Sequence, residues 1–252
     1  MTELQKYYFG FIFVIFKVMN TEQQLKFSPS IFTIPFLFVI VIWFVYWIEI
    51  KFGWNFNKFG VFPRSFDGLK GVICSPFIHS DTKHLFNNSV PLFVLSACLF
   101  YFYKEVAVKV LLFGGIMTGL LTWLIARESY HIGASGIVYL LFSFVLFSGI
   151  IKKNYRLVAV SFVTIFLYGS MVWYVLPIKE GMSWEGHLSG LITGVVLALL
   201  YRKRGIVKEK FEFTKTEFDS MFDEAGNYAP PVIEEEVELE EIKYKYFYKE
   251  EE

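Results

Sequence analysis

An all-α, polytopic membrane protein with six transmembrane helices is the fold class that this sequence predicts. Of its 252 residues, 55% are hydrophobic and 20% are aromatic. The mean hydropathy of +0.46 is rare among soluble domains. Six apolar runs approach the roughly 20 residues that a helix needs to span a bilayer. They cover residues 31–50, 84–103, 106–126, 135–151, 157–177 and 187–201.

The runs divide the chain into three predicted parts. Residues 1–30 form a cytoplasmic or interfacial segment, residues 31–204 a six-helix membrane domain, and residues 205–252 an acidic cytoplasmic tail. In the first part, the apolar stretch 7–16 is too short to span a bilayer, so we expect a helix that lies in the membrane interface. This stretch ends at Lys17 without a small-residue cleavage site, which argues against a signal peptide.

The orientation of the spans follows from the basic residues in the short turns. Several basic residues follow the second, fourth and sixth spans, whereas the short turns after the third and fifth spans hold one basic residue each. The loop 51–83 is too long for the charge rule to apply. We therefore expect a multi-pass protein of the cell inner or plasma membrane with both termini in the cytoplasm. The basic residues after the second, fourth and sixth spans are Lys104, Lys109, Lys152, Lys153, Arg156, Arg202, Lys203 and Arg204.

The tail has a different composition from the rest of the chain. From Phe211 onward, 14 acidic residues and four lysines give a net charge of −10, although the whole chain is neutral. This polar segment predicts a mostly disordered tail, with a partner-binding or regulatory role as the alternative. No basic patch typical of nucleic-acid binding is present, so nucleic acid is not an expected partner. Cys74 lies in the first external loop and Cys98 in the second span, and we expect no disulfide between them.

Two short polar patches open the fourth and sixth spans, His-Ile-Gly-Ala-Ser-Gly at 131–136 and Gly-His-Leu-Ser-Gly at 186–190. Ser135 begins a run of 17 residues and His187 a run of 15. At about 1.5 Å per residue, they lie about 25 and 23 Å from the inner boundary. Because the apolar core is about 30 Å thick, both side chains lie at a similar depth below the outer interface. A hydrogen bond between them is therefore expected, with His187 as the base for Ser135.

The second span adds hydrogen-bond donors at the same depth. His84 and Asn88 are four residues apart and share one helix face, and Asn88 begins a run of 16 residues that ends at Tyr103. A tetrahedral intermediate needs donors directed at its oxyanion. The Asn88 amide, the His84 imidazole and the backbone N–H of Ser135 are suitable donors.

Small and aromatic residues support this geometry. His187, Gly190 and Gly194 lie on one face of the sixth span, where glycines allow a neighbouring helix to approach closely. Gly133 precedes the serine by two residues. Tyr139 lies one turn after Ser135 on the same face, where its ring can pack against His187 and fix the orientation of the imidazole.

Each of these residues alone is more often structural. A single membrane serine usually satisfies a backbone carbonyl, a single histidine often packs, and Tyr139 alone is typical of a core. Together, Ser135 and His187 favour catalytic chemistry, with a proton or ion pathway as the competing use of membrane histidines. No His-Glu-x-x-His motif and no pair of membrane aspartates occurs, so neither a metal nor any other cofactor is expected.

These residues resemble the rhomboid family of intramembrane serine proteases. The resemblance implies that Ser135 is the nucleophile, that His187 is the general base without a third acidic member, and that Gly133 lines the site. It also implies that the substrates are single-span membrane proteins in the lipid bilayer. The matching parts are His79 with His84-x-x-x-Asn88, Gly133-x-Ser135-Gly136-x-x-Tyr139 and His187-x-x-Gly190-x-x-x-Gly194.

One feature departs from the family pattern. Many rhomboids carry a Trp-Arg pair in the first external loop, where this chain has Lys70-Gly71. Inactive relatives typically lose the serine, the histidine or the glycine before the serine, and this chain retains all three. We therefore expect an active enzyme, with a non-catalytic rhomboid-like protein that binds membrane helices as the alternative.

Overall fold

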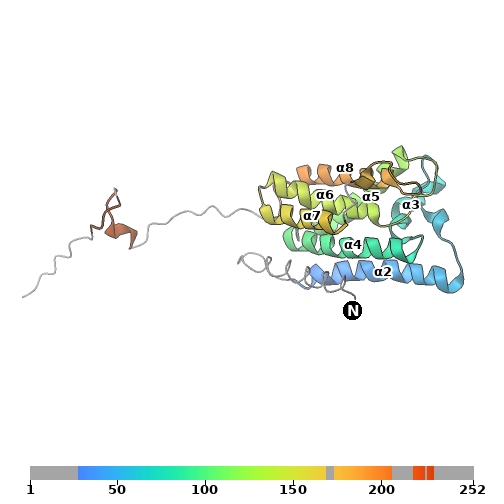
Figure 1. Ribbon diagram of the computed structural model, residues 1–252, viewed down its shortest axis with the longest axis horizontal. Coiled ribbons are helices and arrows are strands. Elements are labelled where there is room, and N and C mark those ends of the chain that lie inside the picture. Colours follow the sequence, from blue (N-terminus) through green and yellow to red (C-terminus); the bar gives the residue numbers. More distant parts are fainter. Residues whose placement is uncertain (1–27, 169–172, 206–217, 225, 230–252) are drawn as a thin grey trace, which may run out of the picture. The chain divides into compact units, whose positions relative to one another are not determined.

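Helices dominate the part of the chain that the computed structural model describes, which comprises residues 28–168, 173–205, 218–224 and 226–229 (Figure 1). Apart from helices, two isolated β-bridges occur over these residues, Val61 with His131 and Phe222 with Tyr228. The expected interfacial helix 7–16 and most of the tail lie outside the described residues. The longer helices are α2 (Ser30–Phe52), α4 (Thr82–Phe102), α5 (Ala107–Ile125), α6 (Ser135–Ile151), α7 (Tyr155–Tyr168) and α8 (Trp184–Leu200).

Three of these helices, α2, α4 and α5, are long and apolar enough to cross a membrane. The other three, α6, α7 and α8, are apolar but shorter, with 17, 14 and 17 residues. Large apolar side chains on α2 and α5 remain exposed, which suits helices that face lipid. They include Phe36, Leu37, Phe44, Leu112, Phe113 and Leu124.

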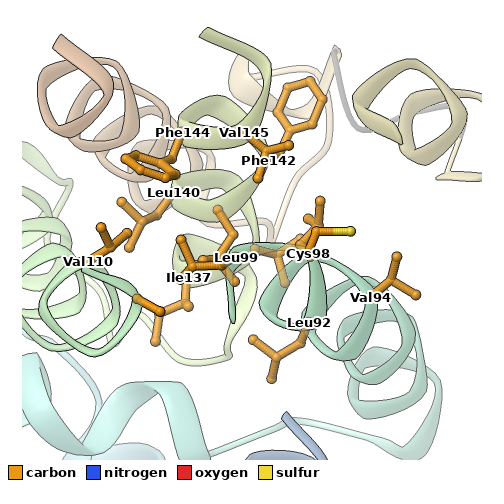
Figure 2. Packing of buried hydrophobic residues seen from close by; sticks show 14 of the residues in the cluster. Leu92, Val94, Cys98, Leu99, Val110, Ile137, Leu140, Phe142, Phe144 and Val145 are labelled. Atoms are coloured by element: carbon orange, nitrogen blue, oxygen red, sulfur yellow. The ribbon is translucent and has the colours of Figure 1, made fainter. Parts of the chain in front are cut away.

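Helix α6 occupies the centre of the bundle. It packs against α4, α5, α7 and α8, and α2 packs on the outer side of α4 (Figure 1). The core lies where α4, α5 and α6 meet, and Figure 2 shows apolar side chains of all three helices converging there. Leu92, Leu99, Val110, Leu140 and Phe144 are fully buried or nearly so.

Glycines bring α6 and α8 close together. A Cβ atom added at Gly190 would collide with the carbonyl oxygen of Gly136, and one added at Gly194 would collide with Ser143 Oγ and the Leu140 carbonyl. The two helices therefore approach with backbone against backbone, as small residues allow in membrane proteins. This contact sets the spacing between the first turns of α6 and α8.

The loop between α2 and α4 folds into four short helical turns: η1 (Asn57–Phe59), η2 (Asp67–Lys70), α3 (Gly71–Cys74) and η3 (Ser75–Phe77). The Arg64 guanidinium donates to the Ala126 carbonyl at 2.8 Å, and the Trp123 indole donates to the Ser65 carbonyl at 2.8 Å. These bonds hold the loop against the end of α5. Gly71 lies against the backbone of Gly60, where any Cβ atom would collide.

Four helices, α2, α4, α7 and α8, begin one to three residues earlier than the hydrophobic pattern predicts. Helix α4 begins at Thr82 because the Asp81 side chain caps it, and α8 begins at Trp184 because the Ser183 side chain caps it. Each cap accepts a hydrogen bond from a backbone N–H of the first turn. The expected fifth span, 157–177, was too long at its end, because residues Trp173–Val175 form a separate 3₁₀ turn, η4, after α7.

Residues 208–252 form a unit of their own. Its described part contains a short turn of 3₁₀ helix, η5 (Asp219–Met221), followed by a tight turn closed by the bridge between Phe222 and Tyr228. The Asp223 carboxylate accepts hydrogen bonds from Asn227 at the backbone N–H, 2.8 Å, and at the side-chain amide, 3.1 Å. This stretch of the tail is therefore ordered locally. Cys74 and Cys98, in the other unit, are both free.

Candidate active site

Ser135 and His187 meet at the first turns of α6 and α8. Ser135 is the first residue of α6, and its Oγ lies 2.9 Å from His187 Nε2. His187 is buried, whereas Ser135 is partly exposed. The close approach of the two helices through Gly136 and Gly190 brings these side chains within hydrogen-bond distance.

A backbone carbonyl determines which nitrogen of His187 carries the proton. His187 Nδ1 lies 2.7 Å from the carbonyl oxygen of Tyr174, in η4. A carbonyl oxygen only accepts, so Nδ1 must be the protonated nitrogen of the neutral ring. Nε2 is then free to accept the Ser135 hydroxyl proton, which is the tautomer that a general base needs. Tyr174 had no signal in the sequence, because the contact uses its main chain.

The ring of Tyr139 fixes the plane of this imidazole. The two rings stack with centroids 4.3 Å apart and an interplanar angle of 13°. Stacking of this kind restricts rotation of His187 about its side-chain bonds and keeps Nε2 directed at Ser135. The structure thus places Tyr139 where the helical spacing predicts.

His84 and Asn88 lie on α4 next to Gly133. Gly133 has a φ of +105°, a region that favours glycine. A Cβ atom at this position would lie 2.7 Å from His84 Nε2 and 3.6 Å from Asn88 Nδ2. The glycine therefore opens the space between Ser135 and the two polar side chains of α4.

The Asn88 amide is a donor without an acceptor. Its Nδ2 atom is buried and has no hydrogen-bond partner among the described residues. A buried, unpaired donor costs about 1–3 kcal/mol, and a catalytic role is one of the explanations for such a group. The position of Asn88 beside Gly133 fits a donor to an oxyanion.

His79 supports the same region from the loop before α4. Its Nε2 accepts from the backbone N–H of Ala134 at 3.4 Å, and its ring packs edge to face against His84 at 5.1 Å. Burial, together with the charge of His84, lowers the pKa of His79 to about 3. His79 is therefore neutral at physiological pH and acts as an acceptor that positions the residue before Ser135.

Asn88→Ala should lower turnover by roughly 10- to 1,000-fold, the range seen when one oxyanion donor is removed. The loss should be partial because the Ser135 backbone N–H and His84 remain. Initial rates on a transmembrane substrate, at saturating substrate, measure the effect. Unchanged rates in both Asn88→Ala and His84→Ala would remove these residues from the site.

A second polar network, absent from the sequence-based prediction, joins the loop before α6 to the start of α8. His131 Nε2 donates to the Arg127 carbonyl at 3.0 Å, and the Ser183 hydroxyl, 2.7 Å from His131 Nδ1, donates to that nitrogen. Ser183 Oγ accepts from the Gly186 backbone N–H. Burial lowers the pKa of His131.

The buried Glu185 carboxylate pairs with Arg127 at 3.3 Å. The sequence did contain a signal for these contacts, because Glu185 is an acidic residue in the first turn of α8 and follows closely on Ser183, which caps the helix.

A small cavity lies beside Ser135. Its volume is about 40 Å³, and a single water needs at least about 10–15 Å³ measured in this way. The lining is polar on several sides, so a bound water would find hydrogen-bond partners there. Its polar side chains are Ser75, Thr118, Thr122, His131, Ser135 and Ser183.

Comparison with known proteins gives a family match and several relatives. The model of the Rhomboid domain matches residues 68–204. An uncharacterized protein of Mycobacterium tuberculosis is 33% identical over 172 residues, which cover 65% of this chain and 72% of the relative. An uncharacterized protein of Mycobacterium leprae is 28% identical over 204 residues, which cover 75% of this chain and 80% of the relative. With its apolar helices and this match, the chain is an integral membrane protein that belongs to the rhomboid family.

Proposed function

We propose that this protein is an intramembrane serine endopeptidase that cleaves single-span membrane proteins near the outer boundary of the membrane. The observation that carries the proposal is the contact of 2.9 Å between Ser135 Oγ and His187 Nε2. The Tyr174 carbonyl holds the proton of His187 on the other nitrogen, so the facing nitrogen is a base. A serine that serves only to satisfy a backbone carbonyl has no need of this arrangement.

The chemistry follows the usual two steps of serine hydrolases. Ser135 Oγ attacks the scissile carbonyl carbon while its proton moves to His187 Nε2. The oxyanion faces the Asn88 amide, His84 and the backbone N–H of Ser135. The imidazolium of His187 then donates its proton to the leaving amine, which gives an acyl-enzyme. Water, activated by His187 as base, hydrolyses the ester and restores Ser135.

The cavity beside Ser135 is a suitable reservoir for the hydrolytic water. It has a volume of about 40 Å³ and polar walls, and an apolar membrane offers no water of its own. The proposal needs no metal or other cofactor, because every proton in the two steps is carried by Ser135, His187 or water.

The site lies at the outer ends of six helices that we propose all cross the bilayer. Helices α6 and α8 have 17 residues each, or about 25 Å at 1.5 Å per residue, which is shorter than an apolar core of about 30 Å. Ser135 and His187 are then recessed below the outer surface, with both termini in the cytoplasm of a cell inner or plasma membrane. A substrate helix must unwind locally there, because helical carbonyls are already hydrogen-bonded.

Purified protein in liposomes with a generic single-span substrate tests the proposal. We expect cleavage by the wild type, none by Ser135→Ala, and labelling of Ser135 by a fluorophosphonate. Binding of the substrate without cleavage or labelling would contradict the proposal and favour a non-catalytic binder of membrane helices.

Truncation after Lys210 should leave cleavage by the purified enzyme unchanged. The tail belongs to a separate unit, and its composition does not provide an apolar core that packs with the helices. Rates of the truncated and full chains in the same liposomes check this. A truncated enzyme that keeps its unfolding temperature but loses activity would show that the tail takes part in catalysis.

A further inference from the structure

Behind His84, on the side away from Gly133, Asp81 and Ser80 form a chain of hydrogen bonds. The Asp81 carboxylate caps α4 by accepting from the His84 backbone N–H at 2.8 Å through Oδ1. Its other oxygen, Oδ2, accepts from the Ser80 hydroxyl at 2.7 Å. Ser80 Oγ in turn lies 3.2 Å from His84 Nδ1. A carboxylate, a hydroxyl and an imidazole are thus linked in series.

The number of available protons determines the direction of these bonds. The His84 backbone N–H and the Ser80 hydroxyl lower the pKa of Asp81, so Asp81 is a carboxylate that only accepts. Ser80 has one hydroxyl proton and donates it to Asp81. The contact between Ser80 Oγ and His84 Nδ1 is therefore a hydrogen bond only if Nδ1 donates.

The direction of these hydrogen bonds determines whether His84 Nε2, the nitrogen that faces the site, can donate. His84 Nε2 is the ring atom nearest to a Cβ at Gly133, at 2.7 Å. In a neutral ring with its proton on Nδ1, Nε2 has no proton to donate. Nε2 donates to an oxyanion only when the ring is an imidazolium, with a proton taken up from water. The partly buried position of the ring disfavours this positive charge before any oxyanion is present, so a negative group close to the ring stabilises it.

We propose that Asp81, acting through Ser80, is a positioning residue that stabilises His84 as an imidazolium and so makes Nε2 a charged donor to the oxyanion. The inference rests on the proposed function. The other titratable side chains around His84 are His79, which packs against its ring, and His187 across the site. His79 is neutral and His187 serves as the base, so the compensating charge comes from Asp81.

Two substitutions separate this role from the capping of α4. Asp81→Asn keeps the cap, because asparagine caps helices as well as aspartate does, but it removes the charge. Ser80→Ala keeps both the cap and the charge but breaks the link to His84. Asp67→Asn is the matched control, because Asp67 is an exposed carboxylate in the first turn of η2, in the same loop.

Both test variants should lower kcat about tenfold with KM unchanged, because charge-assisted hydrogen bonds are roughly twice as strong as neutral ones and the oxyanion exists only beyond the ground state. In a His84→Gln background, Asp81→Asn should cause no further loss. Asp67→Asn should match the wild type in both backgrounds. If Asp81→Asn lowers kcat equally in both backgrounds, Asp81 acts independently of His84 and the inference is overturned.

A spectroscopic measurement tests the link without depending on cleavage. The chain has four histidines, so ¹⁵N-histidine labelling with His84→Gln as reference assigns the His84 ring. At a pH where the ring is neutral, the wild type should carry the proton on Nδ1. In Asp81→Asn the new amide donates to Ser80, Ser80 donates to Nδ1, and the proton should move to Nε2.

A proton on Nε2 in the wild type would overturn the inference. Failure of the proposed function gives a different result: the wild type would then neither cleave nor label at Ser135, whatever the tautomer of His84. Cleavage by the wild type with no change in Asp81→Asn and Ser80→Ala would overturn this inference alone.

Discussion

His187→Ala should lose as much activity as Ser135→Ala, and the double variant should lose no more than either. A nucleophile and its base act as one unit, so removing both costs no more than removing one. We expect losses of roughly 10⁴- to 10⁶-fold, the range reported for such units. Single-turnover rates in liposomes measure them. Because His187 Nε2, the proposed base, lies 2.9 Å from Ser135 Oγ, no other described side chain is expected to replace it.

Ser143→Ala is the matched control for this comparison. Ser143 lies on the same helix, α6, and its hydroxyl donates to the Leu191 carbonyl at 2.8 Å. Losing this hydrogen bond should cost about 1 kcal/mol of stability and leave the rate unchanged. If His187→Ala retained most of the wild-type rate while Ser135→Ala had none, a different base would activate the serine.

Gly194→Val should prevent the bundle from folding stably. A Cβ atom at this position collides with Ser143 Oγ and with the Leu140 carbonyl on α6, and the backbone carbonyl cannot move away without displacing the helix. Overpacking of this kind costs about 1–3 kcal/mol or more, and the two branches of valine add to the collision. Thermal unfolding in detergent and the yield of folded protein measure the loss.

A pair of alanine variants isolates the cause. Gly115→Ala, in α5, adds a Cβ whose nearest neighbour is Ile137 Cδ1 at 3.8 Å, an ordinary contact. Alanine also favours a helix over glycine by about 1 kcal/mol, so this variant should unfold at the same or a higher temperature. Gly194→Ala should unfold at a lower temperature. Equal behaviour of the two would mean that α6 and α8 do not pack through Gly194.

Hydrophobic runs predicted where the helices lie, but not how they begin. The fourth run, 135–151, coincides with α6 because a polar patch precedes it and Lys152 and Lys153 follow it. Helices α4 and α8 begin two and three residues early because Asp81 and Ser183 cap them. Caps are encoded by single polar residues, which a hydropathy pattern averages away.

Parts of the candidate site could be predicted from the sequence and other parts could not. The contact between Ser135 and His187 follows from equal depth on two helices, and the structure contains it. The catalytic roles of these residues remain a prediction. The hydrophobic pattern did not predict the structure of the loop between α2 and α4, because Arg64 and Trp123 hold it through backbone carbonyls. Carbonyls are the same in every residue, so a sequence does not single them out.

The carbonyl of Tyr174 orients His187 through the main chain, so every residue at position 174 carries the accepting atom. Substitutions there change the packing of the Tyr174 side chain on the core but leave in place the carbonyl oxygen that helps to determine which nitrogen is basic. Replacing the peptide bond after Tyr174 by an ester, through chemical ligation, would weaken the acceptor without changing any side chain. Substitution of side chains therefore tests two members of the proposed catalytic unit, Ser135 and His187, whereas the ester tests the third, the Tyr174 carbonyl.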